Sequence, residues 1–138
     1  IMYMTLSAGN EEWDVHEAEG GPSYDDLKRH VGEGAVRDLF DVVRLPNGID
    51  LWVNDEGLLE NLPWSLCIEW GDEGERTQPL CGTVVAARSN AEGETIGLEY
   101  GDKMFLQGHD SRRGHRFVVM SPDHSVIPVL FVEDIRND

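Results

Sequence analysis

Residues 42–63, VVRLPNGIDLWVNDEGLLENLP, are the most sharply patterned part of the chain. Two runs rich in β-branched and aromatic residues flank Pro46-Asn47-Gly48, and Leu51 and Val53 alternate with their neighbours along the second run. Asn-Gly between two such runs is a strong hairpin signal, because both residues accept the positive φ of a type I′ turn. The stretch therefore predicts a β-hairpin at about residues 39–54.

The acidic cluster that follows, Asn54-Asp55-Glu56-Gly57, admits a chemical and a structural interpretation. Its spacing lacks the D-x-[DN]-x-[DN]-G order of a calcium loop, and no His, Ser or Cys partner for acid–base chemistry stands nearby in sequence. A side-chain oxygen of Asn54 or Asp55 can instead cap the next turn, to which Glu56 can return a hydrogen bond. Gly57 can supply a positive φ. We interpret the cluster as a capped turn.

The segment before the hairpin predicts two strands and a helix. MYMTLSA and EWDVHEAE have the composition and alternation of short strands. The main helix is expected at about residues 23–32, with Ser23 as its N-cap, acids in its first turn and bases in its last. Gly32 and Gly34 are expected to end it.

The segment after the hairpin predicts further strands in SLCIEW, PLCGTVVAARS, RFVVMS and VIPVLFVEDI. Pro128 within the last run suggests an edge strand or a bulge. TIGLEY and KMFLQ fit a strand or a short helix. Residues 1–138 therefore predict a single α+β domain, with a mostly antiparallel sheet and one main helix.

Composition bounds the class of protein. The chain has 138 residues, of which 40% are hydrophobic, and no run approaches the roughly 18 apolar residues of a membrane span. No secretory signal is visible, so we expect a cytoplasmic protein. Cys67 and Cys81 lack CxxC spacing and are expected to be reduced and buried.

The charge is strongly negative. The chain carries 27 Asp and Glu against 11 Lys and Arg, a net charge of −16. Nucleic acid and anionic membranes repel such a chain, so neither is an expected partner. The acidity can serve solubility, adaptation to high salt, or an electronegative face that meets a basic partner, and composition leaves these three explanations open.

The run KMFLQGHDSRRGHRF is the one basic island, and it has three interpretations. Lys103, Arg112, Arg113, Arg116 and His115 can form a loop whose arginines pair with acids of this chain, or a site for an anion or nucleotide. The third interpretation is a metal-dependent phosphoesterase. Its ligands would be His109, His115 and His124 with Asp110 and Asp123, although their spacing fits no known local pattern.

Trp52 is expected to point away from the side of Leu51 and Val53. Its side of the strand therefore needs a cover, either another subunit or the C-terminal segment.

Several short motifs of the chain together resemble a family of domains of unknown function found in phages, plasmids and conjugative elements. The resemblance rests on Val31-Gly32, Val43 and Leu45, Val53-Asn54 with Glu56-Gly57, Leu62-Pro63, and Gly82-Thr83-Val84. Departures are the opened pair Gly32-Glu33-Gly34, extra residues before Leu39, and Ser65 where the family usually has Asn. The resemblance covers about residues 24–100 and leaves 103–138 as a β-rich C-terminal addition.

The resemblance implies a small accessory protein of a mobile element, with a role in countering host defence. We accordingly expect a non-enzymatic protein without cofactor or metal, which binds a host protein through an acidic face of Asp50, Asp55, Glu56 and Glu60. The alternative is an oligomeric sponge that sequesters an anionic nucleotide signal through the basic island. A metal-dependent phosphoesterase is the third reading, and a homo-oligomer is expected for the sponge.

Overall fold

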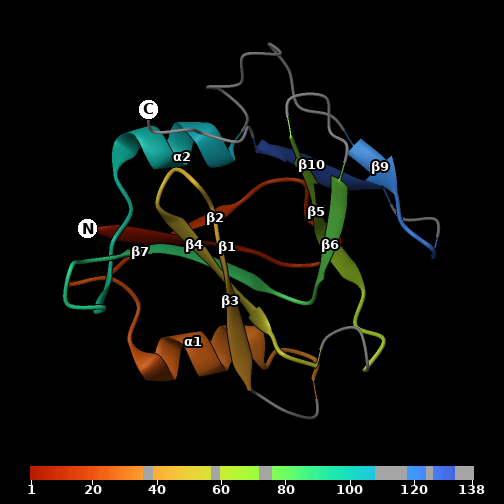
Figure 1. The fold of residues 1–138 in the computed structure, drawn as a ribbon. Coiled ribbons are helices and arrows are strands. Elements are labelled where there is room, and N and C mark those ends of the chain that lie inside the picture. The colour runs from red at the N-terminus through yellow and green to blue at the C-terminus, as the bar shows by residue number, and fades with distance from the viewer. Residues whose placement is uncertain (36–38, 57–59, 72–75, 108–117, 124–125, 133–138) are drawn as a thin grey trace.

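Two β-sheets and two short helices make up the described part of the chain, residues 1–35, 39–56, 60–71, 76–107, 118–123 and 126–132 of a computed structural model (Figure 1). The first sheet has the strand order β2-β1-β7-β4-β3, with β8 also paired to β7, and the second has the order β6-β5-β10-β9. The elements are β1 Met2–Leu6, β2 Asp14–Glu17, α1 Tyr24–Val31, β3 Phe40–Arg44, β4 Ile49–Asn54, β5 Trp64–Trp70, β6 Arg76–Cys81, β7 Val84–Ser89, β8 Thr95–Ile96, α2 Tyr100–Leu106, β9 Val118–Met120 and β10 Val126–Val132.

The core lies between the two sheets. Strands of the first sheet contribute alternate residues such as Met4, Leu51 and Ala86, and the second sheet contributes Leu66 and Ile68, all buried. The period-2 alternation of side chains places these residues on one face. α2 closes the same core with Leu106.

α1 covers the opposite face of the first sheet. Its buried Leu27 and Val31 pack against Tyr3 and Val85, and the half-buried Trp52 joins this cluster. Figure 1 shows α1 and α2 on opposite sides of the first sheet. Trp52 therefore packs in the interface between α1 and the sheet, a cover that the sequence does not predict, and cover by a second subunit stays a prediction.

The hairpin of β3 and β4 is confirmed, but its turn differs from the predicted type I′. The amide of Gly48 donates to the carbonyl of Leu45 at 3.1 Å, and Gly48 has φ 92. Among the described non-glycine residues only Asn61 has a positive φ, so Asn47 does not adopt the conformation a type I′ turn requires. The loop has the pattern of a three-residue connection with a left-handed glycine at its end. Asn47 Oδ1 accepts a hydrogen bond from the Ile49 amide at 3.2 Å.

Two further predictions of elements need correction. The run PLCGTVVAARS forms two strands in different sheets, because Gly82 turns the chain between β6 and β7 with φ 76. The ambiguous TIGLEY and KMFLQ form β8 and then α2, so the described residues hold two short helices of similar length instead of one main helix. The fold is mainly β and mostly antiparallel.

The C-terminal strand β10 is an integral part of the fold. It pairs in parallel with β5, with Val129 opposite Cys67, and it adds Leu130 and Val132 to the core. β10 lies between β5 and β9, so Pro128 does not mark an edge strand. Its ladder with β5 begins one residue after the proline.

Two smaller expectations concern the cysteines and the membrane. Cys67 and Cys81 are free and buried, and burial raises the pKa of each thiol. In the part of the chain that the structure describes, no helix is long and apolar enough to span a bilayer.

Candidate functional site

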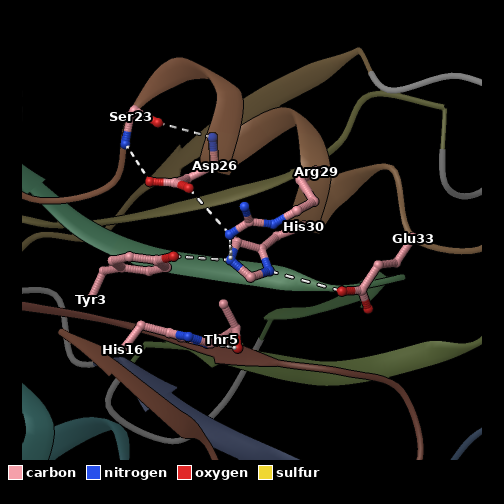
Figure 2. Close-up of polar contacts among 8 residues, drawn as sticks. All are labelled: Tyr3, Thr5, His16, Ser23, Asp26, Arg29, His30 and Glu33. Carbon is pink, nitrogen blue, oxygen red and sulfur yellow. Dashed lines mark hydrogen bonds and ion pairs between the residues drawn. The ribbon is translucent and has the colours of Figure 1, made fainter. Parts of the chain in front are cut away.

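A polar cluster lies between α1 and the β1–β2 edge of the first sheet, beside the apolar residues of that interface (Figure 2). Tyr3 and Thr5 face α1 because they alternate with the core residues of β1. His16 stands opposite Tyr3 in the β1–β2 register. His30 reaches the cluster from the last turn of α1.

The hydrogen bonds around His30 fix its tautomer. Its Nε2 lies 3.0 Å from the hydroxyl of Tyr3 and 3.4 Å from the guanidinium of Arg29. Arginine can only donate, so Nε2 is an acceptor and the proton of the neutral ring sits on Nδ1. Nδ1 faces the carboxylate of Glu33 at 3.9 Å. The Tyr3 hydroxyl therefore donates to His30.

Burial keeps both partners of this hydrogen bond neutral. The pKa of His30 is lowered by burial first and then by His16 and Arg29, against the opposing effects of Glu33 and Asp26. The pKa of Tyr3 is raised, mainly by burial and next by the charge of Asp26. Desolvation disfavours the charged form of each group.

The rings of the cluster pack closely. Tyr3 and His16 are stacked with centroids 4.8 Å apart, and the rings of His16 and His30 are 5.0 Å apart. Nε2 of His16 forms a 2.8 Å hydrogen bond with the hydroxyl of Thr5. Two imidazoles thus share one small, mostly buried volume.

Acidic side chains surround the cluster, but each has another partner. Asp26 closes the capping box of α1 with Ser23 and lies 3.1 Å from Arg29. The backbone hydrogen bond from Ser23 is the largest of the effects that lower the pKa of Asp26. Glu33 accepts a hydrogen bond from the Thr83 hydroxyl at 3.2 Å. Both carboxylates thus have partners other than His30, so neither is reserved as the counter-ion of a protonated His30.

This arrangement suits a site where protonation affects the packing of α1 on the sheet better than it suits a reaction centre. Only 3% of Tyr3 and 7% of His30 are exposed, so a substrate would not reach the hydrogen bond between them. In the described ranges no three His, Cys, Asp or Glu residues come together as a group that could hold a metal. The chemistry that remains open to the cluster is protonation of His30.

The acidic face predicted from the sequence is not brought together as one exposed surface. Asp50 is 4% exposed, accepts a 2.5 Å hydrogen bond from Ser89 and does not belong to any exposed face. Asp55 is exposed, whereas Glu56 and Glu60 are half-buried, and the amide of Glu60 donates to the carbonyl of Glu56. The predicted cap is confirmed, since Asn54 Oδ1 accepts from the Glu56 amide at 2.8 Å.

Most of the predicted basic island lies outside the described residues. This holds for Arg112, Arg113, His115 and Arg116, and also for Gly57 and for His109, Asp110 and His124 of the metal hypothesis. Lys103 is described and is half-buried on α2. Asp123 is exposed and accepts a hydrogen bond from Ser121.

The Tyr3–His16–His30 cluster was not anticipated from the sequence. Its one local signal is the set of polar residues Tyr3, Thr5 and His16 at alternate positions of two adjacent strands, which marks a polar patch on a sheet face. From its place in the sequence, His30 is interpreted as a cation that the helix dipole favours near the C-terminal end of a helix. Only the packing of α1 on the sheet brings His30 to His16.

The fold and the buried cluster define a small, mainly β protein with two packed sheets and one helix-covered face. The profile of the family described as DUF3846, a domain of unknown function, matches residues 10–107, and the chain belongs to this family. The match starts before and ends after the range 24–100 expected from the motifs. No curated protein and no solved structure matches the chain.

Proposed function

We propose that this chain is a non-enzymatic binding protein that presents an acidic sheet edge to a basic surface of a partner protein. The observation that carries the proposal is the segment from Glu11 to Asp25. It holds the exposed acids Glu11, Glu12, Asp14, Glu17, Glu19 and Asp25, and the chain has no Lys or Arg before Lys28. We call these six residues the acidic edge.

The position of β2 supports access of a partner to the acidic edge. β2 is the terminal strand of the first sheet, with β1 as its neighbour. Tyr3–His16 is a hydrogen-bonded pair of the β1–β2 ladder, so the backbone groups of Val15 and Glu17 point away from β1. The 40% exposure of Val15 adds an apolar contact among the acids.

Charge supports a basic partner. An acidic surface raises the association rate with a basic one and rejects nucleic acid and anionic membranes. The mobile-element setting implied by the sequence resemblance makes a host defence protein the proposed partner. Charges on an edge strand also prevent two copies from pairing, so the test must separate binding from solubility.

The test compares two triple variants with the same net charge. The edge variant carries Glu11→Gln, Glu12→Gln and Asp14→Asn, and the control carries Asp41→Asn, Asp55→Asn and Glu92→Gln, all at exposed positions. Proteins captured from bacterial extract are quantified by mass spectrometry, and the Kd of a purified captured protein is then measured at two salt concentrations. We expect roughly tenfold weaker binding for the edge variant alone. Equal binding by both variants would refute the proposal.

A further inference from the structure

The strongest unassigned feature is the pair of imidazoles under α1. His30 is buried, and its Nε2 already faces two donors, the Tyr3 hydroxyl and the Arg29 guanidinium. A second proton on His30 would sit on Nε2. It would require the Tyr3 hydroxyl to turn from donor to acceptor, and it would place a positive charge beside the Arg29 guanidinium.

Charged and titratable groups reach His30 from each element around it. α1 supplies Asp26 and Arg29, β1 supplies Tyr3, β2 supplies His16, and Glu33 follows α1. β7 and β4 add the uncharged Val85 and Trp52 to the same interface. The two carboxylates would stabilise a charged ring, but Asp26 is paired with Arg29 and Glu33 is 54% exposed.

Two effects of opposite sign compete at His30. Its place in the last turn of α1 favours a positive charge through the helix dipole. Burial, His16 and Arg29 disfavour that charge and outweigh the carboxylates of Glu33 and Asp26, so the pKa of His30 is lowered. A proton is therefore held more tightly when α1 has moved away and His30 is in water.

We propose that His30, packed against His16, is a proton-sensitive switch, which keeps α1 docked on the first sheet at neutral pH and releases it on mild acidification. Release would break the 3.1 Å hydrogen bond from Asn54 Nδ2 to the carbonyl of Val31 and expose Leu27 and Val31. The docked state binds fewer protons than the released state. Its stability is therefore complete above about pH 6.5, the ordinary histidine pKa, and falls as the pH drops below that value.

Amide hydrogen exchange followed by NMR measures the release directly. The opening equilibrium of α1, corrected for intrinsic exchange rates, should rise by about threefold or more between about pH 7.5 and about pH 5.5. α2 contains no histidine and is the internal control. A rise of equal size in α2 would indicate general acid destabilisation and would refute the switch.

A matched pair of variants separates the switch from a merely structural cluster. Arg29→Gln removes a positive neighbour, so the acid-induced opening should move to lower pH. Glu33→Gln removes the facing carboxylate but keeps an acceptor for Thr83, so the opening should move to higher pH. Shifts in the same direction, or none, would overturn the proposal.

His30→Gln supplies the remaining test. Glutamine cannot titrate, so most of the change in α1 exchange between the two pH values should disappear. NMR titration of the imidazole signals gives the second readout in the unaltered chain. A midpoint for His30 at or above about 6.5 would contradict the switch, whatever the variant does.

Discussion

At the scale of single residues, Arg88 and Asp102 form the best-defined polar contact of the described chain. The carboxylate of Asp102 accepts two hydrogen bonds from the Arg88 guanidinium, at 2.6 and 2.7 Å, and a third from the Glu99 amide at 2.9 Å. Arg88 also donates to the carbonyl of Asn47 at 3.1 Å. One arginine on β7 thus joins α2 to the turn of the hairpin.

Asp102→Asn should lower the free energy of unfolding by more than most single substitutions do. It leaves Arg88, whose side chain is 25% exposed, without its charged partner. We expect a loss of about 2 kcal/mol in the free energy of unfolding, somewhat below the usual range for a broken buried pair because of that exposure. Urea denaturation measures it. The control Glu92→Gln, at an exposed site, should change stability by less than about 0.5 kcal/mol.

The residue scale also shows what sequence reasoning reaches. Ser23 is the N-cap that the local sequence predicts, and the structure adds a capping box with Asp26 that was not predicted. The sequence predicts Asp50 as part of an exposed acidic face, yet Asp50 is buried in the structure. Local pattern tells which side a residue faces, but not what covers that side.

At the scale of elements, the connection from β2 to α1 depends on two adjacent glycines. Gly20 and Gly21 both have positive φ, 75 and 90. A Cβ on Gly21 would lie 2.6 Å from the backbone carbon of Ile96 in β8, whereas a Cβ on Gly20 meets nothing within 4 Å. The chain therefore passes directly against β8 at Gly21.

Gly21→Ala and Gly20→Ala form a matched pair of substitutions. Gly20→Ala should cost about 1 kcal/mol, since only the left-handed backbone is strained. Gly21→Ala adds a clash with backbone that cannot move cheaply, so we expect about 2 to 4 kcal/mol. Thermal unfolding of both variants measures the difference. Equal losses would mean that the approach to β8 is not tight.

Elements also mark the limit of prediction from one sequence. The run around Gly82 is uniformly strand-like, and nothing local shows that its two halves belong to different sheets. Gly82 turns the chain with φ 76, and a Cβ there would lie 3.0 Å from Cδ1 of Leu62, a residue remote in sequence. The polar cluster likewise depends on tertiary packing. His16 and His30 are 14 positions apart in the sequence, and the packing of α1 brings their rings together.

At the scale of the whole molecule, the boundary of the family match differs from the boundary of the folded core. The match ends at residue 107, yet β10 lies beyond it and occupies an inner position of the second sheet. Leu130 and Val132 are 5% and 4% exposed within the main core. The matched segment alone would leave β5 without its parallel neighbour and would expose that part of the core.

Removal of the residues after 107 should therefore abolish cooperative folding. A less drastic version compares Leu130→Ala with Val126→Ala in the full chain, because Val126 lies on the same strand but is 47% exposed. Leu130→Ala should destabilise the protein by about 2 to 4 kcal/mol and Val126→Ala by less than about 1 kcal/mol. Urea denaturation tests the two variants, and the dispersion of amide NMR signals tests the truncation. If residues 1–107 gave a dispersed spectrum and Leu130→Ala were as mild as Val126→Ala, the C-terminal strand would be an accessory to a core that folds without it.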